Sequence, residues 1–387
     1  MSLGINVSHQ HRLFKLAEKY PVEFYFLKNN VRAWHDFIRP LSDKVHWVAY
    51  YEEGKYDLAI LHLDQQCSNT KLGKAKLYQH LNEVIDCPKI VINHGSPMIP
   101  EYGYDEDVVI NGGWIIDQGS KESLYLPGIK KMIGDSLMVV NSYTARDRWG
   151  WGYPIIHGMD KDEWYDLPDK EPRVVMMISA GGMDKYYNRT LISGIKDRLM
   201  EKYNIPLFHI TVNVKFEPSG DWEQYRKFLG ESLIYINPTL DSPMPSARTE
   251  AMMSGCCVLT SKYHDADQFI ENGVNGFIVP DNPNSYADLI NTLMKNYKAT
   301  RLIGEEGRKT AIKVFSEDRF LRQWWDMINL VLEKGTKEAY NILEKRIDKE
   351  KEETYGKRTK EADEGTDSED NEGTTKRKGR TKGTESL

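Results

Sequence analysis

The stretch from Tyr235 to Pro283, YINPTLDSPMPSARTEAMMSGCCVLTSKYHDADQFIENGVNGFIVPDNP, decides the fold class. Its pattern predicts a strand, a proline-bounded loop, a helix that opens near Ser246, and a strand over residues 257–260. A short helix, a glycine turn and a last strand over residues 277–279 follow. This order of elements is typical of the second half of a nucleotide-binding α/β domain.

The loop of this stretch leads directly into a helix, and we expect a phosphate site there. The first N–H groups of a helix and the positive end of its dipole favour an anion. The loop supplies Asp241, Ser242 and Met244, and the helix supplies Ser246. Glu250 lies one turn further along, where its carboxylate can accept hydrogen bonds from ribose or sugar hydroxyls. The two prolines of the loop have no N–H to offer.

These motifs resemble those of GT-B glycosyltransferases, specifically the retaining enzymes of glycosyltransferase family 4. That family has a Glu-x7-Glu pair around a loop of the type EGFGLPVLE, followed by AMACGxPVV, an acidic helix and GxxGxLVPPGDP. This chain has TEAMMSGCCVL and then FIENGVNGFIVPDNP. The second family glutamate falls on Glu250, whereas Ser242 stands where the first would contact the donor sugar. The identity of that sugar is therefore left open.

The second domain is predicted to open with the strand Val174 to Ile178 and a glycine-containing loop that ends at Lys185. At this place the family carries GRLxxxKG, whose arginine and lysine neutralise the donor diphosphate. The resemblance makes Lys185 the counterpart of that lysine. The arginine is absent, and Arg189, one turn further on, is the candidate replacement. The alternative is a solvated helix start that binds no ligand.

In the first half of the chain, the predicted strand Lys89 to Asn93 ends in His94 and a glycine. The resemblance implies that this histidine faces the donor sugar, which makes His94 the candidate catalytic residue. The alternative is a structural histidine. The Gly-Gly loop that follows the first strand in many relatives is missing, and INVSHQHR stands there instead. Either the acceptor side differs, or the first strand has degenerated.

Strands and helices alternate along the chain, which predicts an α/β fold of two Rossmann-like domains in the GT-B arrangement, facing across a cleft. We expect an acceptor-side domain over residues 1–166, with a first strand from Gly4 to Ser8 and a helix from His11 to Tyr20. A nucleotide-sugar-binding domain is expected over residues 167–313. Between Phe208 and Pro238 it lacks strand and helix steps that the family has, so the nucleobase is not identified.

The segment Val314 to Lys334 resembles the helix that closes the GT-B fold. Ser316 can cap it, and its apolar stripe is expected to pack against the first domain. The stripe consists of Phe320, Trp324, Ile328 and Val331. The closing helix and a helical extension are together expected over residues 314–348, and a disordered charged tail over residues 349–387 because that segment has almost no apolar residues.

Composition limits the functional classes. At 387 residues and 40% hydrophobic, the chain can supply two ordinary cores, and a net charge of −6 gives no overall basic field for nucleic acid. The four cysteines show no C-x-x-C spacing and are expected to be thiols. No signal peptide and no membrane span are predicted, so we expect a cytoplasmic protein. Peripheral membrane contact through HRLFKLAEKY or PGIKKMIG is an alternative to solvated helix faces.

No metal site and no cofactor are expected. The acidic triplets over residues 105–107 and 265–267 are not at convincing strand ends, and we interpret them as solvated carboxylates. Charge on the donor diphosphate would instead be neutralised by Lys185, Arg189 and the helix end at Ser246.

The resemblance implies a hexosyltransferase-like glycosyltransferase that moves a sugar from a nucleotide-diphosphate donor to a carbohydrate, lipid-linked or other hydroxyl acceptor, with retention and without a metal. One alternative is a degenerate GT-B protein that binds or acts as a scaffold without catalysis. A second is a phage-type glycosyltransferase acting on nucleic-acid bases, for which the basic run KRKGRTK is the only support.

Overall fold

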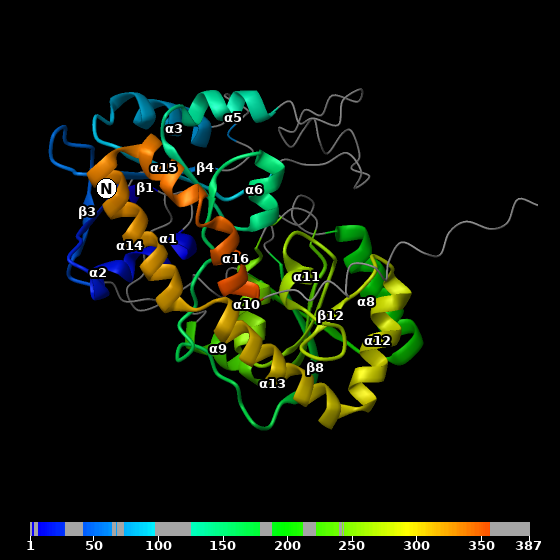
Figure 1. Ribbon diagram of the computed structural model, residues 1–387. Coiled ribbons are helices and arrows are strands. Elements are labelled where there is room, and N and C mark those ends of the chain that lie inside the picture. Colours follow the sequence, from blue (N-terminus) through cyan, green and yellow to red (C-terminus); the bar gives the residue numbers. More distant parts are fainter. Residues whose placement is uncertain are drawn as a thin grey trace, which may run out of the picture. The chain divides into compact units, whose positions relative to one another are not determined.

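Strands on either side of residues 155–170 form two parallel sheets in the computed structural model, which describes residues 2–3, 7–27, 42–63, 67, 73–96, 125–178, 188–211, 222–239, 242 and 244–356. Residues 1–355 make one unit by their contacts. The expected α/β class with parallel sheets is therefore confirmed (Figure 1).

The first sheet has the order β3-β2-β1-β4-β5-β6-β7. Its strands are β1 (Ser2–Leu3), β2 (Phe24–Leu27), β3 (Val45–Val48), β4 (Ala59–Leu63), β5 (Lys89–Asn93), β6 (Leu137–Val140) and β7 (Tyr153–Pro154). Strand order reverses between β1 and β4, so the carboxyl ends of the strands at that reversal are the place where such a sheet binds a ligand.

The second sheet has the order β12-β11-β10-β8-β9. Its strands are β8 (Glu171–Ile178), β9 (Leu207–Thr211), β10 (Ser232–Asn237), β11 (Cys257–Thr260) and β12 (Phe277–Ile278). Here the order reverses between β8 and β10, which are direct neighbours. The loops that leave the carboxyl ends of these two strands hold most of the residues expected in the donor site.

Apolar runs explain why the central strands form. Burial is complete along β4, β6, β10 and β11 and covers the last four residues of β5. Strands buried in this way are typical of parallel sheets that helices cover on both faces. The helices of the first part are α1 (Val7–Phe14), α2 (Leu16–Lys19), α3 (Gly73–Val84), α5 (Tyr125–Ile133) and α6 (Tyr143–Trp149). Those of the second part are α8 (Arg189–Tyr203), α9 (Trp222–Glu231), α10 (Ser246–Met253), α11 (Ala266–Phe269), α12 (Pro283–Lys295) and α13 (Tyr297–Val314).

The closing helix, α14 (Glu317–Lys334), has its predicted cap and its predicted stripe. The hydroxyl of Ser316 accepts a hydrogen bond from the backbone N–H of Arg319, and all four stripe residues are buried. Trp325 stacks on Tyr20, which follows α2, with ring centroids 4.8 Å apart. Lys15 bonds Glu317 at 3.0 Å. The helix thus returns to the N-terminal elements, as the sequence predicts.

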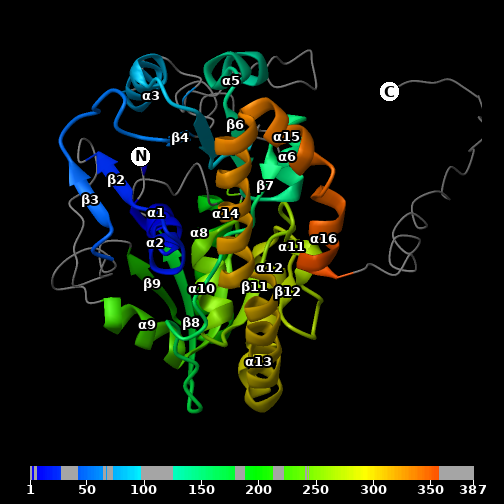
Figure 2. The same cartoon turned by 60° about the vertical axis from the view of Figure 1, so that its left-hand side comes forward.

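Two further helices, α15 (Thr336–Glu344) and α16 (Ile347–Tyr355), follow α14 (Figure 2). α15 contacts β6 and β7, and α16 contacts α13. The expected tail boundary at residue 349 is therefore wrong. The hydroxyl of Tyr153 donates to Glu350 at 2.5 Å, and Thr354 is fully buried. Residues 357–387 lie outside the described residues.

The first strand is also displaced from its expected place. The structure has β1 at Ser2–Leu3 and begins α1 at Val7, whereas a strand from Gly4 to Ser8 was expected. Both residues of β1 pair with β4, and Ser2 also pairs with β2. So short a strand has no alternation from which sequence could locate it.

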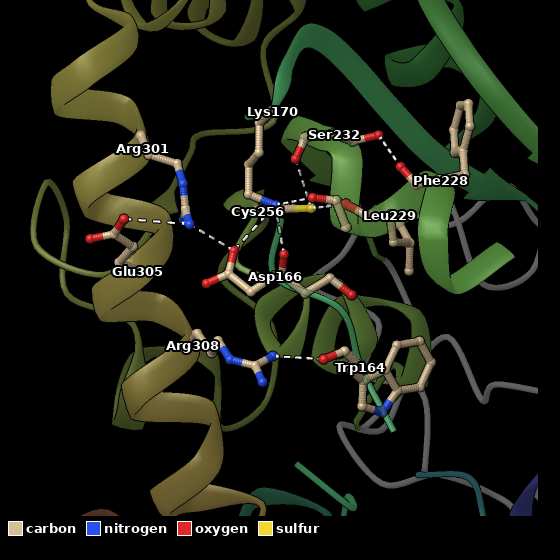
Figure 3. A network of polar contacts seen from close by, with 12 residues as sticks. Trp164, Asp166, Lys170, Phe228, Leu229, Ser232, Cys256, Arg301, Glu305 and Arg308 are labelled. Atoms are coloured by element: carbon tan, nitrogen blue, oxygen red, sulfur yellow. Dashed lines mark hydrogen bonds and ion pairs between the residues drawn. The ribbon is translucent and has the colours of Figure 1, made fainter. Parts of the chain in front are cut away.

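The segment between the sheets is packed rather than loose. Just before β8, Lys170 donates from its buried ammonium to the carbonyls of Gly230, at 2.6 Å, and Ser254, at 2.7 Å (Figure 3). Asp166 lies 3.5 Å from Lys170 and 2.9 Å from Arg301 of α13. This network ties the beginning of β8 to α9, α10 and α13.

The cysteines are free, as expected. No helix among the described residues is long and apolar enough to cross a membrane. The two segments considered for membrane contact use their apolar side chains inside the protein: Leu13, Phe14, Leu16, Ile129 and Ile133 are all buried. These side chains are therefore not exposed to contact a lipid surface.

Candidate functional site

The carboxyl end of β10 and the first turn of α10 form the centre of the candidate site. Strand β10 is fully buried, and the chain then passes through the loop to Pro245, which is the residue before α10. No side chain caps the helix there, because proline offers no acceptor. Ser246 begins the helix and is half-buried. The expected helix end is present, and its first N–H groups are not capped by the residue in front.

Glu250 is fully buried and is held from two directions. The hydroxyl of Tyr225, on α9, donates to Glu250 Oε2 at 2.6 Å. The guanidinium of Arg12, on α1, lies 3.7 Å from Glu250 Oε1 and donates to Ser246 Oγ at 3.1 Å. A residue from the N-terminal helix pair therefore reaches the first turn of α10.

His94 follows β5 and pairs with a second histidine. Its Nε2 lies 2.8 Å from Nδ1 of His62, and the two rings stack with centroids 5.1 Å apart. Burial, with a smaller contribution from His94, holds the pKa of His62 well below its usual value. A neutral His62 can therefore fix the orientation of the His94 ring at the end of β5.

The loop after β5 meets the loop after β11 through a buried histidine. Nε2 of His264 lies 3.0 Å from the hydroxyl of Ser96 and 3.1 Å from the guanidinium of Arg148, while Nδ1 lies 3.2 Å from Ser142 Oγ. Burial first, and the nearby arginines second, lower the pKa of His264 well below its usual value. The neutral imidazole links strand-end loops of the two sheets.

The structure places the other expected residues as follows. Lys185 and Asp241 lie outside the described residues. Arg189 is the first residue of α8 and is exposed, and the side chain of Asn188 caps that helix. Ser242 is half-buried, and Met244 is buried with its sulfur 3.3 Å from the guanidinium of Arg248. Met244, Ser246 and Glu250 thus belong to one local unit.

Asp265 corrects the expectation of a solvated acidic triplet. Its side chain is 1% exposed, and its two oxygens accept hydrogen bonds from the backbone N–H groups of Tyr143 and Thr144. Two N–H donors replace the water that an exposed carboxylate would have. No cluster of three or more His, Cys, Asp or Glu side chains that could hold a metal occurs among the described residues.

Sequence reasoning missed Arg12, His62, Tyr225 and Arg248. Arg12 was interpreted as part of a solvated or membrane-facing helix, yet it is 7% exposed. A usable signal existed for His62, since it interrupts the apolar run AILHL. Arg12 and Tyr225 are brought to Glu250 only by the tertiary fold.

Part of the chain resembles a known protein family. Residues 177–310 match the model of the family described as Glycosyl transferases group 1. The spore coat protein SA of Bacillus subtilis is 33% identical over 157 residues, which make up 40% of this chain and 40% of that protein. The match therefore spans less than half of the length of this relative.

Similar solved structures include the HepE protein of Anabaena in complex with UDP and glucose, with a TM-score of 0.57 and 14% identity over 85% of this chain and 98% of that one. The sucrose-phosphate synthase of Thermosynechococcus elongatus gives the same TM-score and identity over 85% and 93%. A glycosyltransferase from Rickettsia africae gives a TM-score of 0.52 and 12% identity over 86% and 98%. The fold is thus of the GT-B type, as the sequence predicts.

Proposed function

We propose, from a group 1 glycosyl transferase domain on a GT-B fold, that this protein transfers a sugar from a nucleotide-diphosphate sugar to a hydroxyl acceptor. Two neighbouring features carry the proposal: α10 begins without a side-chain cap, and the buried Glu250 lies one turn further along the same helix. The first turn offers N–H groups to a phosphate, and the carboxylate offers acceptors to a ribose. Assignment to family 4 is a narrower proposal that rests on the sequence motifs.

Glu250 suits a ribose because its carboxylate is preorganised. The bond from Tyr225 fixes the side chain before a ligand arrives, so little rotamer freedom is lost on binding. A carboxylate has about four lone-pair sites on its two oxygens, so it can accept hydrogen bonds from several donors at once. Because Arg12 spans Ser246 and Glu250, it would lie beside both the ribose and the phosphate of a bound nucleotide.

The reaction we propose is retaining, independent of a metal ion and free of any cofactor. Loss of the nucleotide diphosphate leaves negative charge on the β-phosphate, and fixed positive groups stabilise it without rearrangement. The α10 start and Arg12 supply such groups, and Lys185 is a further candidate. His94, oriented by His62, is the group we assign to face the reacting sugar.

The acceptor is proposed to be a carbohydrate, lipid-linked or other hydroxyl compound. The HepE structure is a complex with UDP and glucose, which makes a UDP-sugar the first donor to try. The nucleic-acid alternative gains no support from the relatives described above. The degenerate binding protein remains the alternative, and Ser242 in place of the first family glutamate is the observation that favours it.

The test is a screen of UDP- and GDP-sugars for protein-dependent hydrolysis, with calorimetric titration of UDP and GDP. We expect one nucleotide diphosphate to bind and its sugar to be hydrolysed slowly without an acceptor. Binding without turnover for every sugar and acceptor would favour the degenerate protein. No binding of either nucleotide would contradict both readings of the donor site.

Glu250→Gln links the result to the site. The amide keeps the shape of the side chain but has one acceptor oxygen instead of two, so nucleotide affinity should fall about tenfold or more. Glu223→Gln is the matched control, because Glu223 also accepts from a tyrosine, Tyr165, at 2.6 Å but lies on the surface. Equal affinities in both variants would remove Glu250 from the donor site. Activity should also persist in excess EDTA.

A further inference from the structure

Arg248, the third residue of α10, has a fully buried guanidinium with unmade hydrogen bonds. Its relative exposure is 0%, and its Cζ lies 5.2 Å from the ring centroid of Phe269. Nη2 donates to the sulfur of Met244 at 3.3 Å. Within the part of the chain that the structure describes, Nε and Nη1 have no hydrogen-bond partner. A thioether is a weak acceptor, so most of this donor fork is unsatisfied.

Such a group is costly in the absence of an anion. Burial lowers the pKa of Arg248 to about 10, which leaves the guanidinium charged at neutral pH. Asp265 attracts this charge without a hydrogen bond to it, and a buried cation with unmade hydrogen bonds is unfavourable. Arg319 is also buried but donates to the carbonyl of Val314. Arg173, which lies over a phenylalanine ring as Arg248 does, pairs with Glu171.

The guanidinium lies at the start of α10. Long side chains on a helix lean toward its N-terminus, and the contact with Met244, in the loop before α10, fixes this direction. Arg12 reaches the same turn from the other side through Ser246 Oγ. Two guanidinium groups and the first N–H groups of the helix therefore share one end of α10.

The nearby carboxylates are already used. Asp265 accepts from two backbone N–H groups and from the hydroxyl of Tyr355. Glu250 accepts from Tyr225 and pairs with Arg12. Neither carboxylate has a hydrogen bond from Arg248. In the loop pattern EGFGLPVLE that this segment resembles, the position of Arg248 is valine, so the cation is a departure of this chain.

We propose that Arg248 binds an oxyanion of the substrate, a phosphate or a carboxylate, between its guanidinium and the first turn of α10. The inference rests on the proposed function, because it assigns a residue to the same donor site. The oxyanion has two sources, the diphosphate of the donor or a carboxylate on the transferred sugar. A planar guanidinium donates two parallel bonds to either group.

The test is calorimetric titration of the full chain and of Arg248→Met with inorganic pyrophosphate, UDP, UDP-glucose and UDP-glucuronic acid. Methionine has a similar volume and no charge, so the ligand-free variant should melt at the same or a higher temperature than the natural chain. We expect its affinity to fall about tenfold to hundredfold. If the diphosphate is the oxyanion, pyrophosphate and UDP show the loss. If the carboxylate of the sugar is the oxyanion, only the affinity for UDP-glucuronic acid falls.

Arg173→Met is the matched control, and it should melt lower while ligand affinity stays unchanged. Arg248→Lys keeps the charge and should recover part of the affinity, which guards against a variant that misfolds. Unchanged affinity for all four compounds in a folded Arg248→Met would overturn the inference but leave the proposed function standing. If pyrophosphate binds in an Arg248-dependent way but no nucleotide binds, the anion site at Arg248 is supported and the proposed function is overturned. No binding of any compound to the natural chain would overturn both.

Discussion

The carboxylate of Asp265 accepts a hydrogen bond of 2.8 Å from the backbone N–H of Tyr143, the first residue of α6. Its other oxygen accepts from Thr144 at 2.8 Å, and the hydroxyl of Tyr355 adds a third bond. One side chain from the loop after β11 thus holds a helix of the first sheet and the last residue of α16. Loss of the charge affects both of these helices at once.

Asp265→Asn should therefore lower the free energy of unfolding by about 1.5–3 kcal/mol, since an amide can accept at one position only and turns an N–H toward another N–H donor. Urea unfolding measures this change. Asp267→Asn, two residues on and half-exposed, is the control and should stay within about 0.5 kcal/mol of the natural chain. Similar losses in both variants would contradict a specific role for Asp265.

Truncation should separate α16 from the residues that follow it. A chain that ends at Gly356 keeps Tyr355 and should melt as the full chain does, because residues 357–387 are almost without apolar side chains. A chain that ends at Arg346 leaves Tyr153 and Asp265 without partners that they have in α16. Its melting temperature should fall by at least several degrees. Equal melting of the two truncations would mean that α16 adds nothing.

The second sheet could be predicted closely because its signals are local. Gly273 and Gly276 both adopt positive φ, at 78° and 155°, in the turn that the sequence predicted, and Ser316 is a local cap. α16 was missed because IDKEKEETY is dominated by charge. A signal was present, however. Ile347 and Thr354 are seven residues apart and lie on one helix face, where both are buried.

The candidate site could be predicted only in part. Glu250 was located by its motif, but its partner Tyr225 lies 25 residues away on another helix. Arg12 is 234 residues from Ser246, and nothing in its neighbours along the chain indicates that contact. Local patterns specify where a helix begins. They do not specify which side chains of other elements reach it.

The network around Lys170 should be a major contributor to stability (Figure 3). Asp166→Asn leaves the ammonium of Lys170 and the guanidinium of Arg301 without their shared carboxylate, so the free energy of unfolding should fall by about 3–5 kcal/mol. Lys309→Met removes one end of an exposed pair with Glu306 and should change it by less than about 1 kcal/mol.

A larger side chain at Gly255 tests the packing around Asp166. The φ of Gly255 is +68°, and a Cβ built on it would overlap the carboxylate of Asp166. Gly255→Ala should therefore destabilise the fold by a few kcal/mol, since it combines backbone strain with a steric clash. Gly335→Ala has a similar φ of +77° with open space around the new Cβ, so it reports the backbone part alone. Equal effects of the two substitutions would show that Asp166 can move aside.

Three histidines with lowered pKa values, His62 and His264 buried and His157 half-buried, should make the fold sensitive to mild acid. Burial is the main cause that lowers the pKa of His62, His157 and His264 well below 6.5. In the unfolded chain these groups take up protons below about pH 6.5, whereas in the folded protein they do not. The unfolded state therefore binds more protons as the pH falls. Stability is fully present above the unfolded pKa and is lost as the pH falls below it.

Each of these histidines should cost about 1.4 kcal/mol of unfolding free energy at pH 5.5 relative to pH 8. His157→Gln removes one of them and keeps a polar group near Thr249, to which His157 lies 3.2 Å away. Urea unfolding of both proteins at pH 8, 6.5 and 5.5 should show a shallower decline for the variant by about that amount. Glu317 and Glu350 have pKa values raised by burial and act in the opposite sense, but they are common to both chains. Parallel declines would mean that His157 is protonated in the folded protein, despite the arginines that surround it.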